Sequence, residues 1–316
     1  MKVLANDGIA ASGVAALEKA GFEVILKTIA QEQLENFINE NQIDVLLVRS
    51  ATTVRKDLID NCPSLKIIGR GGVGMDNIDV DYARNKGLKV INTPAASSHS
   101  VAELVFAHLF GMVRFLHDSN QNMPLEGDSK FKALKKAYAK GVELKGKTLG
   151  ILGFGRIGQA TAKVGLAVGM KVIAFDPFLD SATVTLDFFD GQTVAFKIDT
   201  ISKEEVLKQS DFISLHVPAQ DDYVISTKEF NSMKDGASIV NAARGGVIDE
   251  VALVKAIADG KIANAALDVF ENEPKPEIQL LMNPNISLTP HIGAATNEAQ
   301  SRIGEELASQ IIEILG

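Results

Sequence analysis

The chain has 316 residues, and its 32 lysines and arginines against 40 aspartates and glutamates give a formal net charge of −8. This acidic balance argues against a nucleic-acid-binding protein, which normally carries a basic excess. A single cysteine, Cys62, excludes a disulfide framework and a cysteine-based zinc cluster. No segment has the pattern of a signal peptide or the roughly 20 apolar residues of a membrane span. We therefore expect a cytoplasmic protein of about two domains, without a metal site or a nucleic-acid or membrane partner.

Short apolar runs alternate with amphipathic stretches in the first hundred residues, and this alternation is typical of parallel strands connected by helices. One such stretch, residues 32–42, carries Leu34, Phe37 and Ile38 on a single helical face. The pattern predicts a compact, flavodoxin-like domain. Its predicted strands are 2–7, 22–26, 44–49, 65–70 and 89–94.

A long helix is expected next, because Ser100 and Glu103 have the spacing of a capping box ahead of the apolar stretch 101–117. Residues 118–141 are polar and rich in lysine, which is not typical of a core segment. His108 and His117 lie nine positions apart on this predicted helix without a metal-ligand partner, and we interpret both as structural residues, as we do His99.

A second series of apolar runs predicts a second parallel sheet, so the expected fold class is α/β with two Rossmann-like or flavodoxin-like domains. Helices are predicted over 204–209, over 250–260 with Asp249 as N-cap, and over about 296–315. The predicted strands lie at the start of 147–158 and within 171–176, 211–218, 237–246, 263–270 and 285–290.

A glycine motif follows the first strand of this second series. The segment GFGRIG (153–158) matches G-x-G-x-x-G, a weak signal by itself. Here it follows an apolar run and opens a helical stretch, as a dinucleotide-binding motif requires. Gly153 permits the tight turn, Gly155 lets the backbone approach a diphosphate, and Gly158 lets the helix pack closely on the sheet.

The same unit predicts which dinucleotide is bound. The amides near Arg156 and Ile157, at the positive end of the helix, are expected to bind the phosphates. Asp176 lies 18 residues beyond Gly158, at the end of the next predicted strand. A carboxylate at that point accepts hydrogen bonds from the ribose hydroxyls and repels a 2′-phosphate, which favours NAD over NADP.

Three polar residues follow later strands of the series: Arg244, Glu273 and His291. Each alone is more often non-catalytic, but open α/β sheets bind ligands at these carboxyl ends. A histidine can exchange a proton with a substrate hydroxyl, and a carboxylate beside it fixes the tautomer. A guanidinium can bind a carboxylate through two parallel hydrogen bonds. Together with a nicotinamide, these groups provide what the oxidation of a 2-hydroxy acid needs.

The segments NAARGGVIDE (241–250), ALDVFENEP (266–274) and TPHIGAAT (289–296), with the glycine motif, resemble the D-isomer-specific 2-hydroxyacid dehydrogenase family. The similarity extends over nearly the whole chain. It implies an NAD-dependent enzyme whose catalytic residues are Arg244, Glu273 and His291. It also implies a substrate-binding domain of residues 1–97 with 291–316, an NAD-binding Rossmann domain of residues 98–290, and an active site in the cleft between them.

The resemblance also assigns ligand contacts. His216, at a predicted strand end, lines the cofactor pocket in one interpretation and is a packed structural histidine in the other. Substrate contacts are expected at Arg49, Arg70, Gly72, Val73, Gly74, Arg244 and His291. Besides the three motif glycines, NAD contacts are expected at Val73, Arg156, Ile157, Asp176, Val217, Ala242, Ala243, Arg244, Asp268, His291, Gly293 and Ala294.

Within the family, residues 48–59, 69–80, 92–104 and 298–306 are most similar to members that oxidise 3-phospho-D-glycerate to 3-phosphooxypyruvate, the first step of serine biosynthesis. A phosphorylated hydroxy acid requires several cations, because its phosphate bears about two negative charges. Candidates are Arg49, Arg70 and the lysines of 130–140, which are otherwise a solvated loop. The alternatives are a hydroxypyruvate or glyoxylate reductase of the same family and an NAD-sensing protein similar to its corepressor members. The family further implies a homodimer formed through the cofactor domains.

Overall fold

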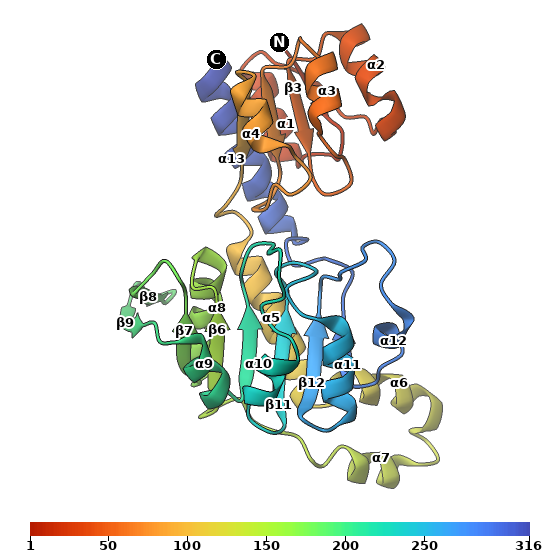
Figure 1. Cartoon of the computed structure of the whole chain (residues 1–316), viewed down its shortest axis with the longest axis vertical. Coiled ribbons are helices and arrows are strands. Elements are labelled where there is room, and N and C mark those ends of the chain that lie inside the picture. Colours follow the sequence, from red (N-terminus) through yellow and green to blue (C-terminus); the bar gives the residue numbers. More distant parts are fainter. The chain divides into compact units, whose positions relative to one another are not determined.

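The computed structural model describes all 316 residues, and they divide into two compact units (Figure 1). Unit 1 comprises Met1–Ser100 and Ala294–Gly316, and unit 2 comprises Val101–Gly293. The chain thus passes between the units at 100–101 and 293–294, where the sequence predicted domain limits at 97–98 and 290–291. Each unit has its own sheet and its own hydrophobic core.

Unit 1 contains a five-stranded parallel sheet in the order β2-β1-β3-β4-β5, an order typical of the flavodoxin-like domain that the sequence predicted. Helices α2, α3 and α4 cover one face around Leu46 and Ile68, and α1 and α13 cover the other around Val45 and Ile67. The strands are β1 (Lys2–Ala5), β2 (Glu23–Ile25), β3 (Val45–Val48), β4 (Ile67–Arg70) and β5 (Lys89–Asn92). The helices are α1 (Ala11–Lys19), α2 (Gln31–Asn41), α3 (Lys56–Asn61), α4 (Val80–Asn85) and α13 (Asn297–Leu315).

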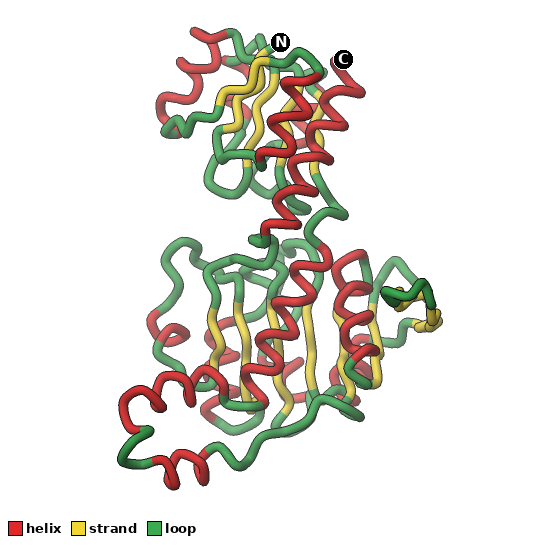
Figure 2. Tube along the Cα trace, turned by 180° about the vertical axis from the view of Figure 1, so that it is seen from behind, coloured by secondary structure: helices red, strands yellow, loops and turns green.

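Unit 2 contains a six-stranded parallel sheet in the order β13-β12-β11-β10-β6-β7. Helices α5 and α8 pack on one face, and Figure 2 shows the long α5 lying across the strands. Helices α9, α10 and α11 pack on the other face. The strands are β6 (Thr148–Leu152), β7 (Lys171–Phe175), β10 (Phe212–Leu215), β11 (Ala237–Asn241), β12 (Ile262–Leu267) and β13 (Ile286–Leu288). The helices are α5 (Ser98–Val113), α8 (Arg156–Ala167), α9 (Lys203–Gln209), α10 (Thr227–Ser232), α11 (Glu250–Ala258) and α12 (Ile278–Leu281).

The segment around α5 differs from the expectation. The helix begins at Ser98, so Ser100 lies inside it and the predicted capping box at Ser100 is wrong. It ends at Val113, and after Phe115, which has a φ of 54°, two helices form an exposed arm: α6 (Leu116–Glu126) and α7 (Phe131–Ala137). No single helix is long and apolar enough to cross a membrane, and α5 and α6 meet that test only together, as a pair bent by 55°.

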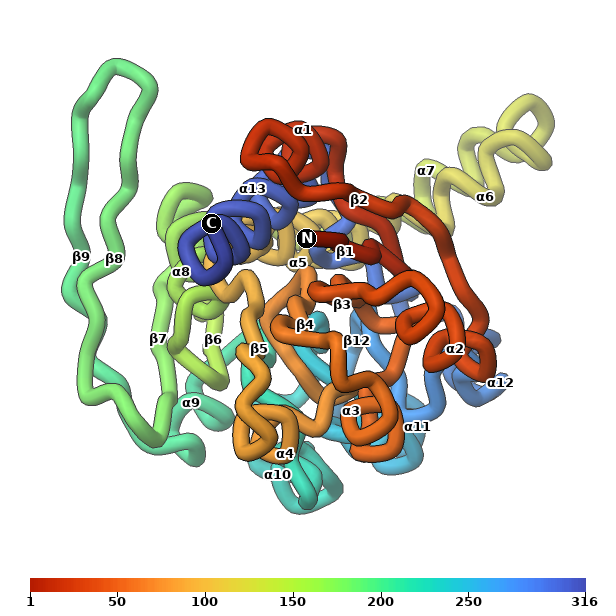
Figure 3. The backbone as a smooth tube through the Cα atoms, turned by 90° about the horizontal axis from the view of Figure 1, so that it is seen from above, coloured from red at the N-terminus to blue at the C-terminus, as the bar shows by residue number.

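A β-hairpin that the sequence analysis did not predict follows β7. Its antiparallel strands are β8 (Ser181–Asp187) and β9 (Thr193–Asp199), and Figure 3 shows it projecting beside β7 and α8. Val184 and Ile198 on its inner face are buried in the core of the unit. The outer face is exposed, and the turn beyond β8 carries the exposed Phe188 and Phe189.

Candidate active site and cofactor cradle

The glycine motif forms the connection between β6 and α8. Gly153 has a φ of +90°, and a Cβ atom there would lie 2.5 Å from the carbonyl oxygen of His216. A Cβ atom on Gly158 would collide with the carbonyl oxygen of Gly153. Gly155, in contrast, faces open space, because a Cβ atom there would have no neighbouring atom within 4 Å. The first and third glycines are therefore required by packing, and the second leaves room for a ligand.

The start of α8 fits a dinucleotide diphosphate. Gly155 is the N-cap of this 12-residue helix, and no side chain caps it. The amides of the first turn, beginning at Arg156 and Ile157, are therefore not bound by a capping side chain at the positive end of the helix dipole. With the open space at Gly155, they form a cradle that accepts an anion.

Asp176 follows β7 directly, beside the glycine loop. Its Oδ2 accepts a hydrogen bond of 2.7 Å from the Phe154 amide, and its Oδ1 accepts one of 2.9 Å from the Phe178 amide. These two bonds fix the carboxylate at the edge of the cradle. This is where the ribose of a dinucleotide is expected.

We expect Asp176→Ser to reduce the preference for NAD over NADP by about tenfold or more, because the substitution removes the charge that repels a 2′-phosphate. The quantity to measure is the ratio of kcat/KM for the two cofactors. Asp180→Ser removes a nearby exposed acidic residue and serves as the control. Equal use of NAD and NADP by the unsubstituted protein would show that Asp176 does not contact the ribose.

The predicted triad lies at the carboxyl ends of three neighbouring strands. Arg244 follows β11, Glu273 lies beyond β12, and His291 follows β13. Nδ1 of His291 is 2.9 Å from Oε2 of Glu273, and Oε1 of Glu273 accepts a bond of 3.0 Å from the Phe270 amide. The His291 and Glu273 side chains are 40% and 36% exposed, so a substrate can reach the imidazole.

Local contacts hold the loop of Arg244 against the segment that leads to Glu273. The Asn241 side chain donates a hydrogen bond to the Arg244 carbonyl and accepts one from the Ala243 amide, at 2.9 and 3.1 Å. Gly245 packs so closely on the Phe270 carbonyl that any Cβ atom would collide with it. The guanidinium of Arg244 donates to the Ala243 carbonyl at 2.7 Å. Asn241 is thus a positioning residue that the sequence analysis missed.

Asp268, predicted as a cofactor contact, is 1% exposed and holds the loop that carries His291. Its Oδ1 and Oδ2 accept the amides of Ile292 and Gly293, each at 2.8 Å. Its carbonyl oxygen accepts the His291 amide, also at 2.8 Å. His291 has a φ of 54°, a conformation that non-glycine residues rarely adopt and that these bonds support.

His216 and Val217 follow β10 and lie against Gly153. Nε2 of His216 is 2.9 Å from the Ser214 hydroxyl, whereas Nδ1 is shielded from solvent and has no hydrogen-bond partner. Burial lowers the pKa of His216 to about 3, so its ring is neutral near pH 7. The imidazole therefore has no positive charge to offer a ligand, although the backbone of His216 borders the glycine loop.

In unit 1, Arg49 follows β3 and Arg70 ends β4. Asn77 connects them, because its Oδ1 accepts a bond of 3.2 Å from Nε of Arg70 and its Nδ2 donates to the Arg49 and Thr52 carbonyls at 2.6 Å. The guanidinium of Arg49 is partly buried and forms no hydrogen bond or ion pair within unit 1. Burial lowers the pKa of Arg49, which the charge of Asp7 opposes.

The remaining predicted contacts lie in three connections. Gly72, at a φ of +152°, lies against the Arg70 guanidinium, and the Val73 carbonyl accepts a bond of 2.7 Å from Asn92, so the loop containing Gly74 is anchored at Val73. The Ala294 carbonyl accepts a bond of 2.7 Å from Gln300. Ala242 is the first residue after β11.

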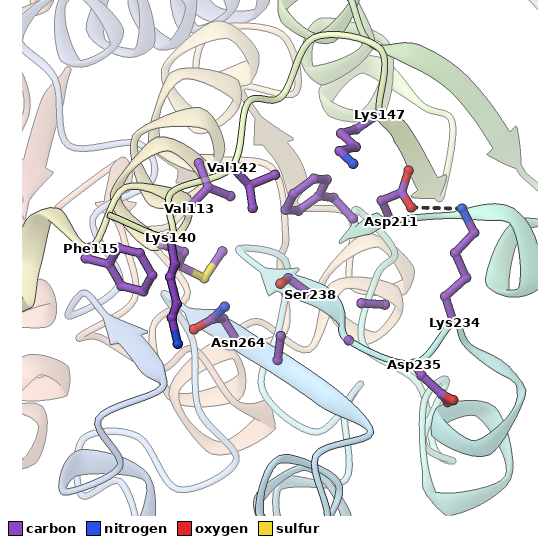
Figure 4. A pocket seen from close by; sticks show the side chains of 15 residues that line it. Val113, Phe115, Lys140, Val142, Lys147, Asp211, Lys234, Asp235, Ser238 and Asn264 are labelled. Atoms are coloured by element: carbon purple, nitrogen blue, oxygen red, sulfur yellow. Dashed lines mark hydrogen bonds and ion pairs between the residues drawn. The ribbon is translucent and has the colours of Figure 1, made fainter. Parts of the chain in front are cut away.

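The lysines of 130–140 are exposed, and Lys130 forms an ion pair of 2.7 Å with Glu126. Lys140 borders a pocket of about 350 Å³ at the amino ends of β10, β11 and β12 (Figure 4). In this pocket, Lys234 forms an ion pair of 2.8 Å with Asp211. The pocket contains no residue of the triad or of the glycine motif, because it lies at the opposite edge of the sheet.

The chain matches known proteins over most of its length. The family model described as D-isomer specific 2-hydroxyacid dehydrogenase, NAD binding domain, matches residues 106–293. A hydroxypyruvate reductase of Thermotoga maritima is 45% identical over 95% of this chain and 93% of its own length. A D-3-phosphoglycerate dehydrogenase of Methanocaldococcus jannaschii is 41% identical over 100% of this chain but only 57% of its own length. A crystal structure of a glyoxylate reductase from Paecilomyes thermophila has a TM-score of 0.79 and 31% identity, over 99% of this chain and 95% of that one.

Proposed function

The chain belongs to the D-isomer-specific 2-hydroxyacid dehydrogenase family and is an NAD-dependent oxidoreductase, and from this premise we propose that its substrate is 3-phospho-D-glycerate. The proposed reaction is oxidation at C2 to 3-phosphooxypyruvate, which would place the enzyme at the entry to serine biosynthesis. In this proposal the triad carries out the chemistry, and Arg49 and Arg70 select the substrate.

The triad accounts for the chemistry of any 2-hydroxy acid. NAD, when bound, supplies the hydride acceptor. Because Nδ1 of His291 faces the Glu273 carboxylate at 2.9 Å, Nε2 is left to take the proton of the C2 hydroxyl. Glu273 stabilises the resulting imidazolium. Arg244 binds the substrate carboxylate, so that the C–H bond and the hydroxyl are held in one orientation.

The observation that carries the choice of substrate is the guanidinium of Arg49. The Arg49 guanidinium is partly buried and has no hydrogen-bonded partner in its unit, so the nearby charge of Asp7 compensates only in part for its lost hydration, and a substrate anion would supply more. Arg70 ends the neighbouring strand, and the two residues are tied together through Asn77. A phosphate is the group that best matches two guanidinium ions in addition to the Arg244 that binds the carboxylate.

A second candidate is the reduction of hydroxypyruvate or glyoxylate. The relative with 45% identity is a hydroxypyruvate reductase that this chain matches over 93% of its length. In that case Arg49 or Arg70 would assist in binding the single carboxylate, and no phosphate would be recognised.

The rates of a panel of substrates, followed by the nicotinamide absorbance, decide between the two candidate functions. We expect the highest kcat/KM for 3-phospho-D-glycerate with NAD and for 3-phosphooxypyruvate with NADH. Faster reduction of hydroxypyruvate or glyoxylate than of the phosphorylated keto acid would favour the second candidate. A protein that binds NADH and turns over none of these acids would instead be an NAD sensor.

We expect Glu273→Gln to move the pH profile of keto-acid reduction to lower pH. Reduction requires the imidazolium of His291, and the substitution removes the negative charge 2.9 Å away that stabilises it. As the pH is raised, the rate of the variant should therefore begin to fall at a lower pH than the rate of the unsubstituted enzyme. Glu277→Gln, an exposed residue of the same segment, is the control. Identical pH profiles for Glu273→Gln and the unsubstituted enzyme would show that Glu273 does not influence the protonation of His291.

The proposal includes a homodimer formed through α5 and the arm of α6 and α7. This segment exposes apolar side chains that a partner could cover, among them Leu116 at 62%, Leu125 at 78% and Phe131 at 56% exposure. A cytoplasmic location stays a prediction from the sequence.

A further inference from the structure

We propose that His108, a buried histidine of α5, is a positioning residue for His291 that acts through Thr289 and Asp268. The inference rests on the proposed function in that His291 is the proton acceptor. His108 is 5% exposed. The sequence predicts a structural role for this histidine, and the proposed chemistry of the triad does not involve it.

A continuous set of hydrogen bonds connects α5 to the catalytic loop. Nε2 of His108 is 3.0 Å from Oγ1 of Thr289, and Nδ1 is 2.8 Å from Oγ of Ser287. Oγ1 of Thr289 donates to Oδ1 of Asp268 at 2.6 Å. Asp268 in turn binds the amides of Ile292 and Gly293.

The direction of every proton in this set follows from the chemistry of the groups. The ionised Asp268 can only accept, so Thr289 must use its one hydroxyl proton to donate to it. The Thr289 oxygen can then only accept from His108, which places the imidazole proton on Nε2. Nδ1 is left as the acceptor for Ser287. Burial lowers the pKa of His108, so its ring stays neutral and this single tautomer persists.

Loss of the His108 hydrogen bond would affect the loop that carries His291. Asp268 is almost completely buried, so water cannot replace a lost donor to its carboxylate. Without His108, the Thr289 hydroxyl is free to rotate, and the hold of Asp268 on the Ile292 and Gly293 amides weakens. His291, at a φ of 54°, then loses the support that keeps its imidazole aligned with the substrate. Arg244 is untouched, so substrate binding should change little.

The test uses two substitutions of His108, each of which places a side-chain amide at the position of one ring nitrogen. The side-chain nitrogen of His108→Gln reaches the position of Nε2 and can still donate to Thr289. The side-chain amide of His108→Asn reaches only the position of Nδ1, toward Ser287. We expect kcat of the Gln variant to stay within about threefold of the unsubstituted value, and kcat of the Asn variant to fall about tenfold with KM nearly constant.

A readout independent of turnover accompanies the kinetics. Hydrogen exchange of the Ile292 and Gly293 amides, followed by NMR, should accelerate about tenfold in His108→Asn and stay near the unsubstituted rate in His108→Gln. If the enzyme fails to oxidise 3-phospho-D-glycerate, the substrate proposal fails, whereas the exchange rates still decide the role of His108. Kinetics are then measured with the best acid of the panel.

Two hydroxyl deletions on one segment provide the matched control. Thr289→Val should lower kcat about as much as His108→Asn, and the two substitutions combined should cost little more than either alone. Ser287→Ala removes the other partner of the same ring and should change kcat less than about twofold. Equal kcat in the Gln and Asn variants, or unchanged exchange at Ile292 and Gly293 in both, would overturn the proposal. A difference only in thermal unfolding would likewise reduce His108 to a packing residue.

Discussion

Replacing His291 with alanine is expected to lower kcat by about 10² or more while the affinity for NADH changes little. Nε2 is the ring nitrogen of His291 that the bond between Nδ1 and Glu273 leaves free. Alanine removes this base and leaves the glycine cradle, which lies at the other strands of the sheet, unchanged. The measurements are kcat under saturating substrate and NADH affinity by fluorescence.

The control for this substitution is His117→Ala, on the exposed helix α6, where the imidazole lies within hydrogen-bond distance of Gln121. It should leave kcat and NADH affinity unaltered. If His291→Ala retained more than about a tenth of the activity, another group would have to take the hydroxyl proton. If it lost NADH affinity to the same extent as kcat, His291 would act mainly in binding.

Neutralising Arg49 or Arg70 is expected to reduce kcat/KM for the phosphorylated substrate by about ten- to a hundredfold. This range corresponds to roughly 1.5–3 kcal/mol for a charge-assisted hydrogen bond to a partly desolvated phosphate. Glutamine is the suitable replacement, because it keeps part of the length and polarity of the side chain. The diagnostic quantity is the ratio of the effects on 3-phosphooxypyruvate and on hydroxypyruvate.

An arginine that recognises phosphate should impair the phosphorylated substrate selectively, whereas one that binds the carboxylate should impair both. Arg55→Gln is the control, since this exposed arginine of the same unit is paired with Asp79 at 3.0 Å. If neither Arg49→Gln nor Arg70→Gln changes the ratio, and substitutions of the lysines of 130–140 do not change it either, then none of these residues recognises the phosphate. Hydroxypyruvate reduction would then be the better assignment.

The sequence alone determined the parts that depend on local order. Apolar runs of strand length separated by helical stretches predicted both parallel sheets, and the glycine motif was recognisable by its position between strand and helix. The sequence also carries the signals of the hairpin β8–β9, because apolar and polar residues alternate in its strands and Asp190-Gly191 is a turn signal. It was missed because its strands pair with each other outside the βαβ pattern that explained the rest.

Only the tertiary structure decided which groups touch. Glu273 and His291 could each be placed at a strand end, but their contact depends on β12 and β13 being neighbours in the sheet. His108 has partners 179 and 181 residues further along the chain, so nothing in its local sequence distinguishes it from a packed histidine. Local patterns determine secondary structure because they act within a few residues. The hydrogen bonds of the site form only after the packing of α5 on the sheet brings distant strand ends and helix faces together.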